Sequence, residues 1–130
     1  MRSYKNETAV KKHIKELMTA HLWFHWPAAA GAFTSVGVAD RLSIRAGVFL
    51  AVEAKFNGNR PTPLQKAFLQ SIMAEGGFGF VVDEKNILVF QTWLETFDRT
   101  TQAVQRGHKP LDEDMALLLD CVRTLTELIV

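Results

Sequence analysis

Apolar and polar positions alternate along the chain with two periods, one typical of helices and one typical of strands. Helical spacing of apolar residues predicts four helices, over residues 4–20, 63–75, 91–105 and 112–128. Strand-like alternation or short apolar runs predict five strands, over residues 21–26, 39–45, 48–55, 78–82 and 87–90. Mixed helices and strands of these lengths predict an α/β fold.

The strands over residues 39–45 and 48–55 are joined by Ala46-Gly47, a pair that favours a tight hairpin turn. Both faces of the second strand begin apolar, which predicts a central strand covered on both sides. Asp40, Glu53 and Lys55 nevertheless stand where apolar residues are expected. The hairpin therefore brings two carboxylates and one ammonium group to one end of a sheet.

This combination of charges suits metal-assisted hydrolysis of phosphodiester bonds. Hard oxygen ligands bind Mg²⁺, and a nearby cation can act on the attacking water or on the charged phosphate. A lone carboxylate on a buried strand is costly, and Lys55 only partly offsets the desolvation of Glu53. A metal cation that shares the site is the expected partner of the two carboxylates.

The elements Ala39-Asp40 and Glu53-Ala54-Lys55 resemble the motif of the PD-(D/E)XK nuclease superfamily, with alanine in place of the proline. The continuation over residues 57–65 is similar to the VRR-NUC (virus-type replication-repair nuclease) branch, in which a Thr-Pro-x-Gln helix start follows the strand. The resemblance covers roughly residues 7–83. It implies a restriction-endonuclease-like core, in which a mixed central sheet is flanked by helices.

The resemblance also implies roles for individual residues. Asp40, Glu53 and the backbone carbonyl of Ala54 would bind Mg²⁺ or Mn²⁺, with Glu7 as a further ligand. Lys55 would orient the attacking water, and Gln65 would hold Lys55 or the water. From the residues alone, Gln65 is equally well placed at the rim of its helix to bond a loop carbonyl, and Glu7 can simply favour the positive end of its helix. The apolar stripe that includes the position of Gln65 is formed by Leu64, Phe68, Leu69 and Ile72.

Basic residues gather in the first half of the chain, although the net charge is only +1. Residues 1–66 hold ten Lys and Arg against four Asp and Glu, and residues 67–130 hold five against ten. Such a surface can follow a phosphate backbone, or it is ordinary solvated surface. The residues predicted to contact nucleic acid are Lys11, Lys12, Lys15, Arg41, Arg60 and Lys66, with Ser35 in a loop of small residues.

Residues 91–130 lie outside the resemblance and are predicted to form an αα-hairpin on a core of residues 1–90, within a single domain overall. The last helix carries a heptad-like apolar seam formed by Leu111, Met115, Leu118, Val122, Leu125 and Ile129. Trp93, Phe97 and Val104 of the preceding helix are expected to fill this seam, and the alternative is a contact between subunits. Stand-alone viral members of the family act as dimers on four-way junctions, so the resemblance implies a homodimer.

Composition removes several classes of protein. The Lys-rich N-terminal segment lacks the apolar stretch of a signal peptide, and no run approaches about 20 apolar residues. A cytoplasmic protein is therefore expected, and the resemblance implies a bacterial or phage-infected cell. The single cysteine, Cys121, forms no internal disulfide and no zinc cluster. No Ser/His/Asp or Cys/His arrangement has a supporting context, and no Gly-rich phosphate loop precedes a helix.

The sequence thus predicts a metal-dependent DNA endonuclease of phage type, similar to Holliday-junction resolvases and selective for branched DNA. Two readings from other classes remain open. One is a non-catalytic DNA-binding module with the same fold. The other is an assembly protein that acts through its C-terminal helices.

Overall fold

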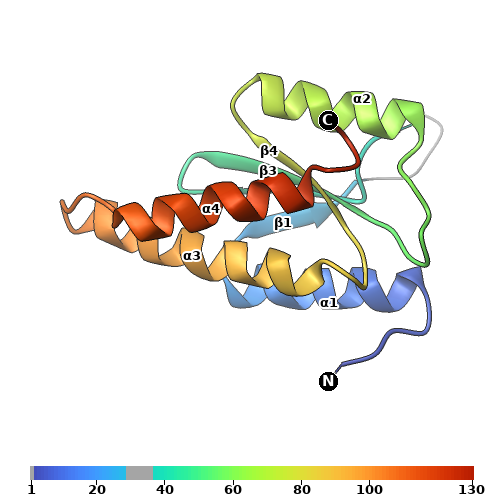
Figure 1. Cartoon of the computed structure of the whole chain (residues 1–130), viewed down its shortest axis with the longest axis horizontal. Helices are drawn as coiled ribbons and strands as arrows, with labels where there is room; N and C mark the ends of the chain where they lie inside the picture. Colours follow the sequence, from blue (N-terminus) through green and yellow to red (C-terminus); the bar gives the residue numbers. More distant parts are fainter. Residues whose placement is uncertain (1, 29–36) are drawn as a thin grey trace.

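A computed structural model describes residues 2–28 and 37–130 of the chain (Figure 1). Ser35, a predicted phosphate contact, lies outside the described residues. The elements are, in order, α1 (Glu7–Ala20), β1 (Phe24–Pro27), β2 (Arg41–Arg45), β3 (Val48–Ala54), α2 (Pro63–Ala74), β4 (Phe78–Val82), α3 (Ile87–Gln105) and α4 (Asp112–Leu125). The predicted α/β class is confirmed.

The strands form one mixed sheet in the order β1-β2-β3-β4. β1 and β2 pair antiparallel, as do β2 and β3, whereas β3 and β4 pair parallel across the α2 connection. Ala46 and Gly47 both have positive φ, at 50° and 77°, as the tight turn of a two-residue hairpin requires. The predicted hairpin and the central position of its second strand are therefore confirmed.

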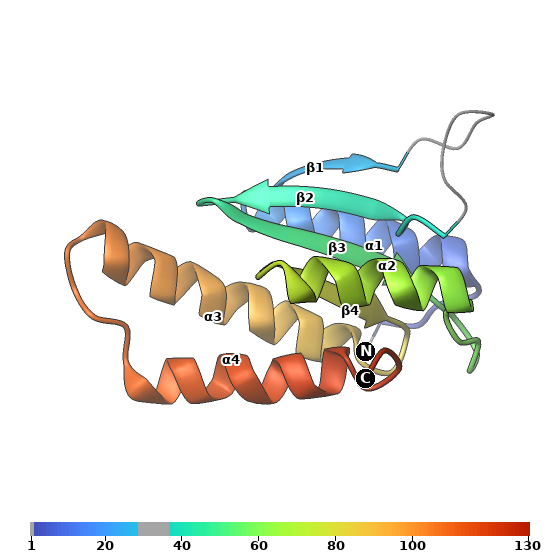
Figure 2. The same cartoon turned by 90° about the horizontal axis from the view of Figure 1, so that it is seen from above.

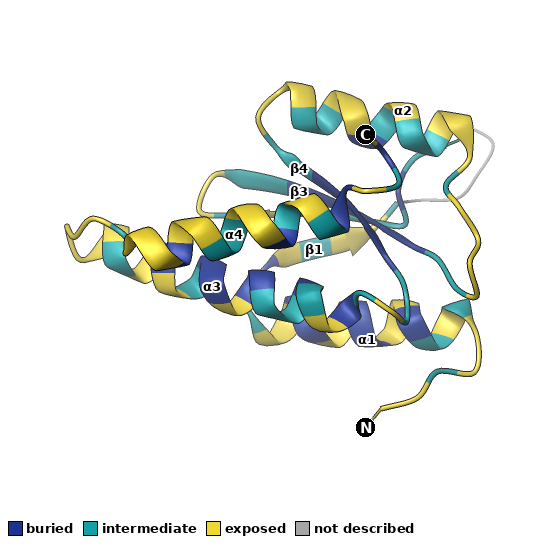
Figure 3. Ribbon diagram, viewed as in Figure 1, coloured by how far each residue is buried: buried dark blue, intermediate teal, exposed yellow. Residues whose placement is uncertain are grey.

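Helices cover the sheet on both faces. Figure 2 shows α2 over β3 and β4 on one face, with β1 and β2 extending beyond it. The opposite face packs against α1 and α3, and α4 packs on α3. In Figure 3 the buried residues concentrate in β3, β4 and the inner sides of the helices.

Side chains of β3 alternate between two hydrophobic clusters. Leu50, Val52 and Ala54 belong to the larger cluster, on the side of α1 and α3. Ala51 belongs to the smaller cluster, on the side of α2, together with Leu69, Val81 and Ile129. Glu53 is two residues after Ala51 on the same strand, so its side chain also points to the α2 side of the sheet.

Helix α1 begins at Glu7 because Asn6 caps it, accepting a hydrogen bond of 3.0 Å from the backbone nitrogen of Ala9. The predicted start at residue 4 is therefore three residues too early. The apolar stripe faces the sheet as predicted, and its members Val10, Ile14, Leu17 and Met18 are all buried.

Helix α2 starts with a capping box between Thr62 and Gln65, with Pro63 at the first helical position. It ends before Gly76, whose φ of +89° suits the left-handed conformation that follows many helices. The predicted apolar stripe is narrower than expected, because Leu64 is 57% exposed and Leu69 alone of this helix is fully buried. Leu64 packs instead beside Gly37.

The strand predicted over residues 87–90 is wrong, because this segment is the first turn of α3. Asp83 and Asn86 close a tight turn directly after β4. The side chain of Asp83 accepts a hydrogen bond of 3.0 Å from the backbone nitrogen of Asn86. In return, the side-chain oxygen of Asn86 accepts a hydrogen bond of 2.9 Å from the backbone nitrogen of Asp83. This turn starts a helix whose residues Ile87 and Phe90, three apart, both point into the core.

Helices α3 and α4 pack on each other as the predicted hairpin (Figure 1). Helix α4 ends at Leu125, three residues before the predicted end, and its apolar seam is buried only toward that end: Leu125 is buried, whereas Leu111 and Met115 are exposed. Ile129 is buried beyond the helix, in the cluster on the α2 side. Val104 of α3 is also exposed and does not fill the seam, contrary to the prediction. Here the hairpin projects past the end of the sheet, and none of the described strands covers it (Figure 2).

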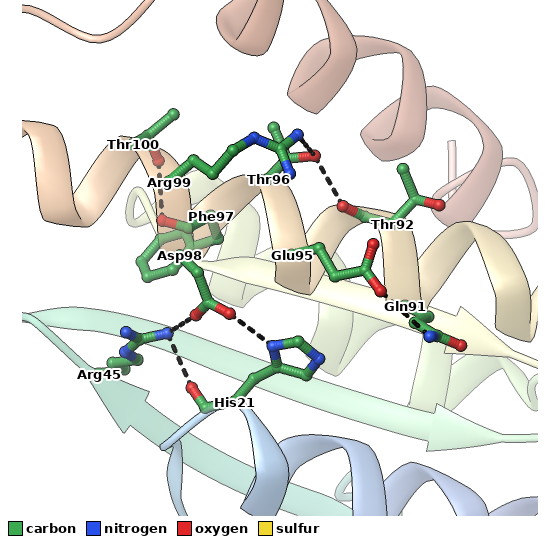
Figure 4. A network of polar contacts seen from close by, with 10 residues as sticks. All are labelled: His21, Arg45, Gln91, Thr92, Glu95, Thr96, Phe97, Asp98, Arg99 and Thr100. Carbon is green, nitrogen blue, oxygen red and sulfur yellow. Dashed lines mark hydrogen bonds and ion pairs between the residues drawn. The ribbon is translucent and has the colours of Figure 1, made fainter.

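A polar network fixes α3 to the end of the sheet at which β2 finishes (Figure 4). Asp98 of α3 accepts hydrogen bonds from His21 Nδ1 (2.5 Å) and from the guanidinium of Arg45 on β2. The Arg45 guanidinium also donates to the backbone oxygen of His21 at 2.7 Å and stacks over Phe97. Within the described residues, no helix combines the length and the apolar character that crossing a membrane requires.

Candidate metal and nucleic-acid site

Asp40 lies immediately before β2 and is tied to the backbone of β3. Its Oδ2 atom accepts a hydrogen bond of 2.8 Å from the backbone nitrogen of Ala54. Arg41, the first residue of β2, pairs with Val52 of β3 in the antiparallel register, so Asp40 comes opposite Glu53. The two carboxylates that the sequence singles out are thus neighbours at one end of the sheet.

Glu53 is buried on β3, with 2% of its surface exposed. Within the described part of the chain, its Oε1 atom is buried and has no hydrogen-bond partner. Burial first, and then the negative charge of Asp40, raise the pKa of Glu53 to about 8, although Lys55 and Lys11 act in the opposite direction. Without a cation, this carboxyl group therefore holds a proton at neutral pH.

Lys11 of α1 lies between two carboxylates. Its ammonium nitrogen is 3.3 Å from Asp40 Oδ1 and 3.2 Å from Glu7 Oε2. Burial alone would lower the pKa of Lys11, but the charges of Asp40 and Glu7 and their hydrogen bonds outweigh it and raise this pKa above its ordinary value. Lys11, predicted as a nucleic-acid contact, therefore also neutralises part of the charge of Asp40 and Glu7. Glu7, predicted as a metal ligand, is connected to Asp40 through Lys11.

Lys55 follows Glu53 by two residues and is half-buried. Its backbone nitrogen donates to the carbonyl of Val82 at 2.9 Å, which continues the pairing of β3 with β4. Gln65 uses its side-chain oxygen to accept a hydrogen bond of 2.9 Å from the backbone nitrogen of Thr62. Gln65 thus has a local capping role, and its contact with Lys55 stays a prediction.

The ligands predicted for a cation are the carboxylates of Asp40 and Glu53 and the carbonyl of Ala54. Over residues 2–28 and 37–130, no three His, Cys, Asp or Glu side chains are arranged as a ready metal site. A divalent cation nevertheless suits Glu53, because it would supply the missing partner of the buried Oε1 atom and favour the ionised form. The donor set consists of oxygen atoms, which Mg²⁺ and Mn²⁺ prefer.

A basic pocket of about 510 Å³ opens beside Asp40, between α1 and the ends of β1 and β2. The cations that line it are Lys11, Lys12, Lys15 and Arg41. Four of the six predicted nucleic-acid contacts that lie among the described residues therefore meet in one place. Arg60 and Lys66 do not line this pocket: Arg60 is in the exposed segment before α2, and Lys66 is on α2.

His25 supports the basic pocket, a role that the sequence did not indicate. Arg41 Nη1 lies 2.8 Å from His25 Nδ1, and His25 Nε2 lies 2.7 Å from the hydroxyl of Thr19. Burial, followed by the charges of Arg41 and Lys15, lowers the pKa of His25. The neutral imidazole can therefore accept the hydrogen bond from Arg41 and donate one to Thr19, which holds the guanidinium in place. The only signal in the sequence was the position of His25 on a short strand.

No family model matches the chain, and no curated protein matches it in sequence.

Proposed function

We propose that this protein is a metal-dependent endonuclease of the PD-(D/E)XK type that cuts DNA, with a preference for branched substrates. The observation that carries the proposal is the pairing of Glu53, which is buried with an unpartnered oxygen, and Asp40, which also lines a pocket together with basic residues. A buried carboxyl oxygen without a hydrogen-bond partner does not stabilise a strand. In a site that binds a cation, this oxygen would gain the cation as its partner.

Asp40, Glu53 and the carbonyl of Ala54 would hold Mg²⁺ or Mn²⁺. When bound, such an ion supplies Lewis-acid stabilisation of the charge that develops on the phosphate and lowers the pKa of a water molecule. The hydrogen bond from Ala54 keeps one oxygen of Asp40 fixed and leaves the other, Oδ1, paired only with Lys11 among its described contacts. Asp40 is thus held in position by the strand whose residues would complete the site.

The other residues would position DNA and water. Lys12, Lys15 and Arg41 line the pocket and would bind backbone phosphates, which gives affinity without reading the sequence. Lys55, which directly follows β3 and is two residues from Glu53, would orient the attacking water and stabilise charge. A homodimer would place two such sites on the two strands of a junction, in a cytoplasmic, phage-related setting.

Cleavage of labelled DNA tests this proposal directly. Four-way-junction, flap, single-stranded and linear duplex substrates are incubated with Mg²⁺, Mn²⁺ or EDTA. We expect the wild type to cut a branched substrate only with metal, and Lys55→Met and Asp40→Asn to lose at least about 100-fold in rate. Lys109→Met, which changes an exposed lysine outside the pocket, should cut normally. Equal cutting by the wild type and both site variants would contradict the proposed site.

A non-catalytic DNA-binding module is the second candidate. One observation favours it: in the described part of the chain, no three His, Cys, Asp or Glu side chains come together as a metal site would require. Such a module would bind DNA in EDTA with an affinity that falls steeply with salt, and it would cut none of the substrates. Lys15→Met would weaken this binding, whereas Asp40→Asn would leave it unchanged or strengthen it.

A further inference from the structure

We infer that Lys11 is an internal counter-ion that occupies the cation position beside Asp40, and that a divalent metal must displace it to bind. This inference rests on the proposed function, because it concerns the same carboxylates. It adds a competitor that is built into helix α1.

The position of the Lys11 ammonium group supports a direct competition. Its nitrogen lies 3.3 Å from Asp40 Oδ1, the oxygen that does not accept from Ala54. Oδ1 is therefore the oxygen of Asp40 that is available to a metal, and it already has a cation beside it. A divalent cation on this oxygen would lie close to the ammonium group, and the repulsion between the two positive charges favours displacement of the lysine.

Glu7 gives the displaced lysine an alternative partner. Glu7 Oε2 lies 3.2 Å from the same ammonium nitrogen, and the two residues are one turn apart on α1. Lys11 can therefore leave Asp40 and keep one ion pair. Both ion pairs are partly exposed, since 45% of the Lys11 side chain is accessible, and such pairs are weak. The lysine is thus a counter-ion that a divalent cation can displace.

The neighbouring lysines offer a matched comparison. Lys12 and Lys15 are also on α1 and line the same pocket, but neither forms an ion pair with Asp40 among the described contacts. Lys12→Met removes the same charge as Lys11→Met, at the next position of the helix. The two variants therefore separate direct competition for Asp40 from a general change in the electric field.

Binding of Mn²⁺ to the full chain without DNA, followed by the electron paramagnetic resonance signal of free Mn²⁺, tests the inference. We expect Lys11→Met to bind Mn²⁺ about three- to tenfold more tightly than the wild type, as the loss of one or two weak ion pairs predicts. Lys12→Met should change the affinity less than about twofold. Lys11→Gln provides a second variant at the same position, and circular dichroism checks that each variant is folded.

Three results would overturn the inference. Equal tightening in Lys11→Met and Lys12→Met would show that only the overall charge matters. Weaker binding in Lys11→Met would show that Lys11 holds the ligands in place for the metal. An absence of Mn²⁺ binding in all variants would overturn the metal site of the proposed function as well, and only this result would do so.

Discussion

The carboxylate of Asp40 accepts a hydrogen bond from the backbone nitrogen of Ala54, with 2.8 Å between Oδ2 and the nitrogen. Ala54 is the last residue of β3, and Asp40 precedes the first residue of β2. The side chain therefore occupies the position of the next backbone acceptor at the end of the two-stranded ladder. One residue both completes the pairing of two strands and presents a charge beside Glu53.

Replacement of Asp40 should separate these two roles. Asp40→Ala leaves the Ala54 nitrogen without an acceptor and should lower the free energy of unfolding by about 1–3 kcal/mol. Asp40→Asn keeps an acceptor oxygen and should cost less than half as much, although it removes the charge. Urea denaturation of both variants measures the difference, with the exposed Asp112→Ala as a control. Equal losses in the alanine and asparagine variants would contradict the structural role of the hydrogen bond.

Glu53 should make stability depend on pH when no metal is present. Its pKa is raised from 4.5 to about 8, so the folded chain binds more protons than the unfolded chain between these values. The contribution of Glu53 to stability is therefore full below about pH 4.5 and is lost as the pH rises through 8.

Glu53→Gln should remove this loss. Each unit of pKa shift corresponds to about 1.4 kcal/mol, so in EDTA the glutamine variant should become the more stable protein by a few kcal/mol near pH 8.5. Thermal unfolding of both proteins from pH 5 to pH 8.5 checks this. Glu113→Gln, at an exposed position on α4, should follow the wild type. Parallel curves for the wild type and Glu53→Gln would show that Glu53 is not protonated in the fold.

The network of Asp98 should contribute to stability without contributing to the proposed chemistry. Asp98→Ala leaves Arg45 poorly exposed and without its carboxylate, which should cost about 2–3 kcal/mol. Glu95→Ala, on the exposed side of the same helix and bonded only to Gln91 among the described residues, should cost less than about 0.5 kcal/mol (Figure 4). A loss for Asp98→Ala as small as that for Glu95→Ala would show that the network is not stabilising.

Gly79 should tolerate no side chain. A Cβ atom at this position of β4 would lie 2.8 Å from the carbonyl oxygen of Leu69 and 3.1 Å from its Cα, so α2 itself would have to move. Gly79→Ala should therefore lower the free energy of unfolding by about 1–3 kcal/mol, as overpacking does. Denaturant unfolding monitored by circular dichroism measures the loss. An unchanged midpoint would mean that α2 shifts on the sheet at no cost.

The elements that the sequence predicts best are those with local signals. The turn at Ala46-Gly47 and the start of α2 at Thr62 depend on residues within a few positions of each other, and both lie where predicted. The strand predicted over residues 87–90 failed because a continuous run of four apolar residues fits either a short strand or a helix. The turn made by Asp83 and Asn86 starts a helix at this point, and the apolar run itself gives no indication of that turn.

The candidate site is predictable to the extent that it depends on one hairpin. The proximity of Asp40 and Glu53 follows from the register of β2 and β3, which the turn fixes. The contact of Lys11 with Asp40 depends on how α1 packs on the sheet, and sequence spacing carries no signal for it. The contact of His25 with Arg41 similarly requires the pairing of a four-residue edge strand.

Ile129, which packs with Ala51 and Leu69, links the segment after α4 to β3, the strand that bears Glu53. The side chain of Gln70 on α2 adds a hydrogen bond of 2.6 Å to the carbonyl of Ile129. Contacts between residues so far apart in sequence slow folding, because a large loop must close before they form. During synthesis, the α2 side of the sheet therefore stays open until Ile129 has left the ribosome.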